Sequence, residues 1–428
     1  FSAAETKWLP LLVALGKFVD NKDYSEEEVA NLTWDQKSRL IKSDPVTCAR
    51  YFDYRFQRFM FEVLMDKSRP IGEIVDYFYR IEFQQRGSPH VHMLVWIKNA
   101  PSTKSHSNID VTGFVDKYLT CSKTAAEDYL VNYQTHRHAR SCMKKNKPVC
   151  RFNFPIPPMP STVILSPIED AESGSAQKHY EKISNFINLP EMKETEMSFD
   201  EFLFKLGIDF DTYKQAIRSS LKQEKIFLRR KPCETRINLY NPTLLKCWLA
   251  NMDIQFVLDP YACAAYIVSY ISKGQRGMSN LLHKACEEAL AEESDIRQQV
   301  RRIGNQFLTH VEVGAQEAAY LVLQMPLRRT SRKVLFVNTT PLEDRVVMIK
   351  PKHVLEDMTE ESTDIESGNI VTLYQQRPKD IDRVCLADFV SQFSVKYQSK
   401  QKKAKLLADG ELPELEYEEN VSDFQPQE

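Results

Sequence analysis

Hydrophobic and polar positions alternate most regularly between Arg80 and Trp96, and this pattern predicts two short β-strands joined by a tight turn. On the first strand Ile81 and Phe83 alternate with polar residues, and the Arg-Gly-Ser-Pro string at 86–89 supplies the turn chemistry. Successive side chains on a strand point to opposite faces. The second strand therefore places four residues on one face: His90, His92, Leu94 and Trp96. The residues between them take the other face: Val91, Met93 and Val95.

The two histidines of this hairpin are two residues apart, so both imidazoles lie on one face, close enough to bind a single cation. Glu82 and Gln84 share a face of the preceding strand, and either residue can supply an oxygen ligand. In the alternative interpretation, His90 and His92 are ordinary polar residues on a half-buried strand, because a bare His-x-His pair is a weak motif. The hairpin thus predicts a metal site whose third ligand stays open between Gln84 and Glu82.

Apolar residues at helical spacing predict that most of the remaining chain is α-helical. Helices are expected within residues 1–78 and at five later places: residues 214–227, 261–273, 281–302, 316–321 and from 386 onward. Period-two alternation predicts further strands at residues 251–258 and 331–340, whereas residues 202–210 fit either element.

A second group of possible ligands has the spacing His-x-His-x3-Cys-x7-Cys: His136, His138, Cys142 and Cys150. Imidazole and thiolate side chains so close together suit a closed tetrahedral zinc site with a structural role. Cys121 is a spare candidate. The alternative is a coincidence of two free thiols and two exposed histidines. A proline-rich run at residues 155–160 follows the group, and we expect it to form a stiff connector.

Two tyrosines lie one helical turn apart in the helix that we expect at residues 261–273. An Asp-Pro pair at 259–260 suits the helix start, and Gly274 suits its end. Tyr266 and Tyr270 then share one helix face, and Lys273 lies near that face one turn further on. Alternatively, the tyrosines are packed core aromatics and the lysine is a cation at the negative end of the helix dipole.

Length and composition change this picture only in part. The chain has 428 residues, of which 42% are hydrophobic, enough for two or three domains with cores of their own. No run reaches the roughly eighteen apolar residues of a membrane span. Nine cysteines, an odd number in a long chain, argue against a secreted disulfide scaffold and favour a reducing compartment. We find no phosphate-binding loop of the Gly-x4-Gly-Lys-Ser/Thr type.

The formal net charge of −2 conceals an uneven distribution of charge. Residues 214–236 hold eight basic side chains: Lys214, Arg218, Lys222, Lys225, Arg229, Arg230, Lys231 and Arg236. Residues 409–428 are acidic and hold no basic side chain. A local basic segment can bind phosphates within a neutral protein, although a solvated helix face has the same composition.

The string from Glu82 to His92 resembles the signature of Helitron transposases, which belong to the HUH endonuclease superfamily, and Val91 occupies the middle of the His-hydrophobic-His triplet. The Tyr-Ile-Val-Ser-Tyr-Ile-Ser-Lys-Gly string at 266–274 is similar to the two-tyrosine motif of the same endonucleases. The His/Cys group and the segments at 314–318 and 386–389 are also similar to Helitron sequences, so the resemblance covers most of the chain.

The resemblance implies an α+β fold in which an antiparallel sheet carries the metal hairpin, flanked by helices, with a zinc-stabilised insertion and further helical regions. It implies five segments: a first part of the nuclease core (1–100), the zinc insertion (101–165), a linker with a basic DNA-contacting region (166–250), a second part of the core (251–285), and a helical or mixed region with an acidic link (286–428). Phe1 and Ser2 are expected at the end of a strand, in a chain cut from a longer polypeptide that carries a helicase.

The resemblance also implies an activity: cutting and rejoining single-stranded DNA through a 5′-phosphotyrosine intermediate. Tyr266 and Tyr270 are then the nucleophiles and Lys273 assists them. His90 and His92 hold Mg²⁺ or Mn²⁺, with Gln84 as the favoured third ligand and Glu82 as the second choice. The DNA is single-stranded or locally melted, and the residues expected to contact it are Arg86, Lys214, Arg218, Lys222, Lys225, Arg229, Arg230 and Lys231. We expect a nuclear location.

Two other functions stay open at this point. A domesticated DNA-binding protein would keep the fold without the activity. An unrelated hydrolase would use the His-x-His pair with a metal-bound water and would leave both tyrosines in the core.

Overall fold

The structure, a computed structural model, describes most of the chain. The described residues are 1–83, 87–103, 105–139, 142–143, 150–168, 173–193, 195–271, 298, 301, 305, 313–335, 337, 340, 349–350, 352–356, 370–396 and 416–419. They form two units, residues 1–332 and 333–428, which are described separately below. The fold is of the α+β class, as predicted, with a small antiparallel sheet and many helices.

Helices occupy the region before the hairpin, as the apolar spacing predicts. They are α1 (Leu9–Val19), α2 (Glu26–Asn31), α3 (Trp34–Ser43), α4 (Pro45–Phe59) and the π-helix η1 (Met60–Leu64). Side chains cap three of these starts: Ser25 and Thr33 form capping boxes for α2 and α3, and Asp44 accepts the Thr47 amide at the start of α4. Helix α4 buries one aromatic face in the core: Phe52, Phe56 and Phe59.

The predicted hairpin is present, formed by β1 (Ile74–Phe83) and β2 (Pro89–Ile97) in antiparallel register. Strand β5 (Arg328–Thr330) pairs with the other edge of β1, giving the order β2-β1-β5. Ser2 forms a bridge with His90 on the outer edge of β2, as expected for the end of a strand. The strand predicted at 331–340 is wrong for its described residues, because the residues that pair with β1 precede it.

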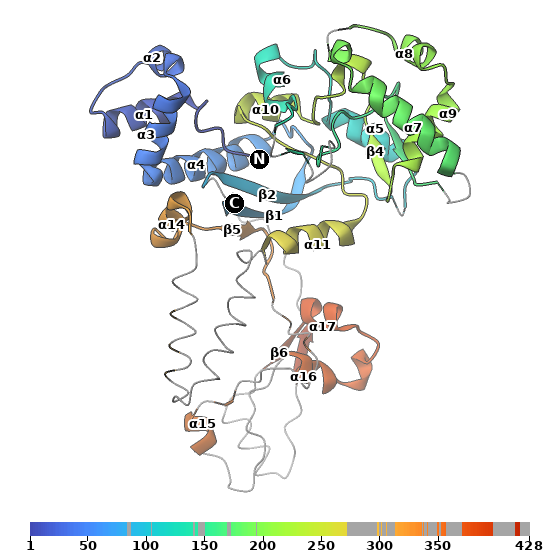
Figure 1. Ribbon diagram of the computed structural model, residues 1–428. Coiled ribbons are helices and arrows are strands. Elements are labelled where there is room, and N and C mark those ends of the chain that lie inside the picture. Colours follow the sequence, from blue (N-terminus) through green and yellow to red (C-terminus); the bar gives the residue numbers. More distant parts are fainter. Residues whose placement is uncertain are drawn as a thin grey trace. The chain divides into compact units, whose positions relative to one another are not determined.

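The two faces of the hairpin have different environments, as the alternation predicts. Tyr79, Ile81 and Val91 are buried on the face covered by α4, where the rings of Phe56 and Tyr79 lie 4.9 Å apart, centroid to centroid. The opposite face carries the polar residues of both strands and lies toward α11 (Pro260–Ile271), on the other side of the sheet from α4 (Figure 1).

Trp248 lies at the centre of the main core. It ends α10 (Pro242–Trp248), it is fully buried, and its indole Nε1 donates a hydrogen bond to the Ser2 carbonyl at 3.0 Å. Five aromatic rings surround it, with centroid distances between 5.1 and 6.2 Å: Phe1, Trp8, Phe52, Phe56 and Phe59. The indole thereby joins the chain start, α4 and α10 into one core.

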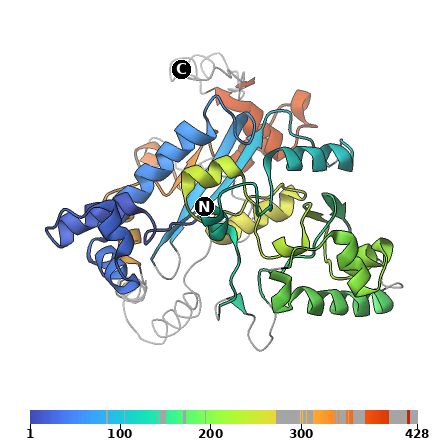
Figure 2. The same cartoon turned by 90° about the horizontal axis from the view of Figure 1, so that it is seen from above.

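Within the stretch between the hairpin and α10, residues 159–227 form a second, smaller core, and their helices lie to one side of the sheet in Figure 2. The elements of this stretch are α5 (Asn108–Tyr118), α6 (Asp128–Gln134), β3 (Val163–Leu165), α7 (Ser173–Ile187), η4 (Pro190–Lys193), α8 (Phe199–Leu206), α9 (Phe210–Ser219), β4 (Lys225–Phe227) and η5 (Pro232–Glu234). Phe202, Tyr213 and Ile217 are among its buried residues. The domain boundaries implied by the resemblance stay a prediction.

The structure decides between the two alternatives for one segment of this stretch and corrects the prediction for another. Residues 202–210 are helical up to Leu206, so the helix interpretation holds there. The basic helix predicted at 214–227 is wrong beyond Ser219, because Lys225–Phe227 pairs with β3 instead. The proline-rich run, predicted to be a stiff connector, packs against the fold: Pro155, Pro157 and Pro158 are buried, and Met159 exchanges two backbone hydrogen bonds with Arg230.

Residues 251–258 are not a strand, in contrast to the prediction. Ile254 and Phe256 are half-buried against the main core, but the segment has no strand partner among the described residues. Its alternation therefore reflects one-sided packing rather than sheet pairing. The helix start that follows is as predicted, because the Asp259 carboxylate accepts the amides of Tyr261 and Ala262 at 2.9 and 3.1 Å.

The remaining elements are short. Helix α14 (Ala315–Val322) confirms the helix predicted at 316–321 and contacts α4 within the first unit. The second unit contains α15 (Lys352–Glu356), α16 (Ile370–Gln375), η7 (Lys379–Ile381), the expected helix α17 (Leu386–Gln392), and the paired strands β6 (Phe393–Lys396) and β7 (Glu416–Glu419). Most of the helix predicted at 281–302 lies outside the described residues. None of the described helices has the length and apolar character needed to cross a bilayer.

Replacing Trp248 by alanine should lower the free energy of unfolding by about 3–5 kcal/mol, because the indole leaves a cavity among five rings. Trp34→Ala is the matched control, since Trp34 is 69% exposed and its loss should cost within about 0.5 kcal/mol. Urea unfolding followed by circular dichroism measures both values. Equal losses for the two variants would contradict the central place of Trp248.

Candidate functional site

The hairpin register brings the predicted metal ligands together. Glu82 pairs directly with His90, and Arg80 pairs with His92. The diagonal neighbours Glu82 and His92 are in contact, with 2.8 Å between carboxylate Oε2 and imidazole Nε2. The rings of His90 and His92 lie 4.7 Å apart. Two histidines and one carboxylate therefore occupy a single patch on the polar face of the sheet.

His90 is held in an orientation suited to ligation. Its Nδ1 shares a hydrogen bond of 2.9 Å with the Ser2 hydroxyl, so Nε2 is the ring nitrogen that can bind a cation. Burial lowers the pKa of His90 to about 3, and the positive charge of neighbouring His92 acts in the same direction. The imidazole is thus neutral near pH 7, which is the protonation state that binds metals.

Tyr266 lies beside this patch. Its ring centroid is 6.1 Å from that of His92, with the two planes at 71°, and the side chain is 52% exposed. A partly exposed tyrosine against a histidine differs from the buried core aromatic of the alternative interpretation. Tyr270 belongs to the same helix, but the structure describes only its backbone, and Lys273 lies outside the described residues.

For the third ligand the structure describes only one of the two candidates. Gln84, and the turn residue Arg86, lie outside the described residues. Glu82 touches His92, and the preference for Gln84 as third ligand stays a prediction. In the described part of the chain, however, the hairpin residues do not form a group of three or more converging His, Cys, Asp or Glu ligands, so a catalytic metal is not shown.

The group that does converge is the predicted His/Cys set: His136, His138, Cys142 and Cys150, whose ligand atoms all lie within 4.8 Å of one another. Nε2 of His136 is 3.2 Å from Nδ1 of His138 and 3.4 Å from Sγ of Cys150, and Nδ1 of His138 is 3.5 Å from Sγ of Cys142. Both thiols are buried. This arrangement of two imidazoles and two thiols is consistent with a zinc site.

Backbone contacts from distant segments hold this cluster. The His136 amide donates to the Arg236 carbonyl at 2.8 Å, and the Arg151 amide donates to the Cys142 carbonyl at 2.7 Å. The Phe154 ring stacks on His136 with 4.5 Å between centroids. Burial lowers the pKa of His136, which favours its neutral, metal-binding form. Cys121, the spare candidate, is not a member of the cluster; its Sγ lies 3.3 Å from the Arg229 carbonyl.

The predicted DNA-contacting residues fall into two classes. Lys222, Arg229 and Lys231 are exposed. The others are partly or wholly buried: Lys214, Arg218, Lys225 and Arg230. Arg230 is only 3% exposed, and its guanidinium donates to the carbonyls of Glu234 and Ile237. It therefore belongs to the interior, and burial likewise lowers the pKa of Lys225.

Sequence reasoning did not identify two residues that contact the sites. Ser2 fixes His90, and Phe154 stacks on His136. No sequence pattern identifies Ser2, because its partner His90 lies 88 residues away in the chain. Phe154 lies four residues after Cys150, and this short distance from a predicted ligand is the sequence feature that could have identified it.

Comparison with known protein families places residues 3–95 in one of them, described as the Helitron helicase-like domain at the N-terminus. Residues 3–95 are thus a Helitron-related domain. The matched region runs from the first helices to Val95, near the end of β2, and includes Glu82, His90 and His92. Neither the curated proteins nor the solved structures gave a match. The Helitron match does not include the His/Cys cluster or α11, so their roles rest on geometry.

We expect the His/Cys cluster to bind about one zinc ion, and Cys142→Ser to abolish that binding, because a tetrahedral site has no spare ligand. Cys121→Ser is the matched control, a buried thiol outside the cluster, and should retain the metal. Mass spectrometry of the metal content of protein purified without chelators measures both. Zinc retained in Cys142→Ser, or absent from the unmodified chain, would contradict the assignment.

Proposed function

We propose that this Helitron-related protein cuts and rejoins single-stranded DNA with Tyr266 as the nucleophile. The observation that supports this most is the contact between α11 and the hairpin, in which the Tyr266 ring lies 6.1 Å from the His92 ring. Residues 174 positions apart in the chain thereby meet on the polar face of one sheet. The match of residues 3–95 to a Helitron domain supports a DNA substrate.

The hairpin residues fit a divalent cation. The His90 imidazole is neutral, the Glu82 carboxylate touches the His92 ring, and nitrogen with oxygen donors suits Mn²⁺, and Mg²⁺ more weakly. His90, His92 and Glu82 would hold the ion. When bound, Mg²⁺ or Mn²⁺ would draw negative charge from the oxygens of the scissile phosphate. Gln84 is the alternative third ligand.

The chemical step is a transesterification. The Tyr266 oxygen attacks phosphorus, its proton leaves to a base, and the bond from phosphorus to the 3′ oxygen breaks. That oxygen takes a proton and becomes a free 3′-hydroxyl, while the 5′ phosphate stays on the tyrosine. A phenol is a weak acid with a pKa near 10, so a proton acceptor must assist the attack. The phosphodiester energy is conserved, and the reverse attack rejoins the strand.

Other parts of the chain complete the proposal. The exposed side chains of Lys222, Arg229 and Lys231 are the basic residues best placed to contact phosphates. The His/Cys cluster, with zinc bound, would have a structural role in the insertion. Tyr270 and Lys273 are proposed as second nucleophile and assisting cation. We also propose that the full polypeptide carries a helicase and that the protein is nuclear.

Tyr266→Phe should lower the yield of covalent protein–DNA adduct by roughly 100-fold or more, because the variant keeps the ring and loses the nucleophilic oxygen. The assay incubates the protein with labelled single-stranded oligonucleotides and Mn²⁺ and separates products under denaturing conditions. Tyr261→Phe is the matched control, a tyrosine of the same helix that is 85% exposed, and it should retain full yield.

The two alternative functions, a DNA-binding protein and a hydrolase, each predict a different result in this assay. Binding without any adduct would indicate a domesticated DNA-binding protein. Cleavage without adduct, unaffected by Tyr266→Phe, would indicate a hydrolase that uses a metal-bound water. Either result would refute the proposed transesterification.

The third ligand can be tested with Glu82→Ala and Gln84→Ala. If Glu82 binds the ion, Glu82→Ala should lower the adduct rate at limiting Mn²⁺ by about tenfold or more, since even residues that only support a ligand have effects of this size. Gln84→Ala should then change the rate little. The reverse order of the two effects would assign the ligand to Gln84.

A further inference from the structure

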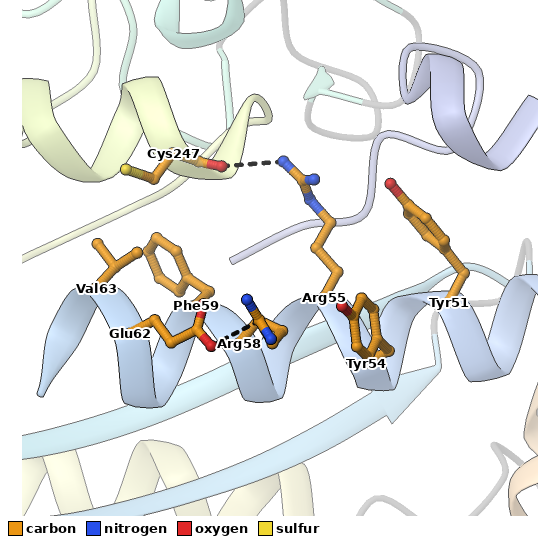
Figure 3. A pocket seen from close by; sticks show the side chains of 8 residues that line it. All are labelled: Tyr51, Tyr54, Arg55, Arg58, Phe59, Glu62, Val63 and Cys247. Atoms are coloured by element: carbon orange, nitrogen blue, oxygen red, sulfur yellow. Dashed lines mark hydrogen bonds and ion pairs between the residues drawn. The ribbon is translucent and has the colours of Figure 1, made fainter.

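A small pocket opens on α4, on the side of the sheet away from Tyr266. It has a volume of about 230 Å³, and its lining includes Tyr51, Tyr54, Arg55 and Arg58 of α4, with Cys247 of α10 opposite (Figure 3). Neither the two metal-binding patches nor the basic 214–236 segment contributes to it. Two phenol rings and two guanidinium groups thus line one opening.

Arg55 is a fixed positive charge in this pocket. Its Nη2 donates to the carbonyls of Cys247 and Trp248 at 3.0 and 2.7 Å, and its guanidinium lies 5.0 Å from the Trp8 ring. These contacts hold the group without neutralising it, because none of the described ion pairs includes Arg55. Its Nε is buried and has no hydrogen-bond partner among the described residues. Such a preorganised guanidinium suits an anion.

Tyr54 supplies an exposed aromatic ring beside this charge. Its side chain is 61% exposed, and the Arg58 guanidinium lies 5.9 Å from its ring. Arg58 also forms an ion pair of 2.7 Å with Glu62. Two guanidinium groups against one carboxylate leave the pocket with a net positive charge. A phosphate and a flat aromatic group together match this lining.

We infer that the pocket binds one nucleotide of a single DNA or RNA strand, with the base on Tyr54 and the phosphate near Arg55 and Arg58. The volume argues for a strand rather than an enclosed free ligand, because pockets that enclose drug-sized molecules measure roughly 300–1,000 Å³. A strand needs space for one base and can continue outside the opening. Base stacking on an aromatic ring tolerates any sequence.

This site is separate from the proposed chemistry. Tyr79 and Ile81 face α4, whereas Glu82 and the histidines lie on the opposite face toward Tyr266. Strand binding on α4 therefore does not require cleavage, and it can hold even if the tyrosine mechanism is wrong.

The test measures binding of a fluorescent single-stranded oligothymidylate to the full chain by anisotropy, in a Tyr266→Phe/Tyr270→Phe background without added divalent ions. Tyr54→Ala should weaken binding by about five- to 150-fold, the loss of one stacked base, and Tyr54→Phe should not. Glu62→Gln should strengthen binding, because it removes the carboxylate next to the phosphate. Phe204→Ala, an 88% exposed aromatic on α8, is the control and should have no effect.

Photocrosslinking locates the strand independently of total affinity. An oligonucleotide with iodouridine should crosslink to the α4 peptide that contains Tyr51 and Tyr54. Thermal unfolding confirms that each variant is folded. Affinities of Tyr54→Ala and Glu62→Gln that match Phe204→Ala, with no crosslink in α4, would overturn the inference. Displacement of the strand by an equal concentration of thymidine monophosphate would overturn it in favour of a free nucleotide, and displacement by an acidic peptide would favour a protein ligand.

Discussion

The alternation of side chains along one hairpin is the constraint on which the rest of the first unit depends. Because neighbouring residues of a strand point to opposite faces, burying Tyr79, Ile81 and Val91 against α4 forces Glu82, His90 and His92 to the other side. A shift of one residue in register would exchange the two sets. The aromatic core around α4 therefore fixes the position of the polar patch without touching it.

Residues distant in sequence then complete both polar sites. The hydroxyl of Ser2 orients His90, and the carbonyl of Arg236 anchors His136. Ser2 fixes an imidazole, whereas Arg236 fixes the backbone that carries one. A partly buried imidazole that is held by a hydrogen bond has less rotational freedom, which favours ligand binding because less entropy is lost.

These contacts explain how much of the molecule could be predicted from the sequence. The hairpin and the His/Cys cluster were predictable because their residues are close in sequence, so periodicity and spacing suffice. Tyr266 was found only through motif resemblance, since no local pattern shows that residue 266 meets residue 92. The strand predicted at 251–258 is wrong for a related reason: alternating burial can arise from packing on a core without a paired neighbour.

The basic residues show most clearly that local sequence does not reveal the surroundings of a side chain. Arg230 and Arg55 both donate hydrogen bonds to backbone carbonyls at the ends of turns or helices, yet Arg230 is buried and Arg55 borders an open pocket. The segment with the highest density of basic residues, 214–236, therefore includes charges that stabilise the fold. Conversely, α4 looks like an amphipathic core helix in sequence but presents a guanidinium pair at a surface. The density of basic residues along a chain does not show whether each side chain is exposed or already paired with a carboxylate. These two properties decide whether a basic side chain can bind a phosphate.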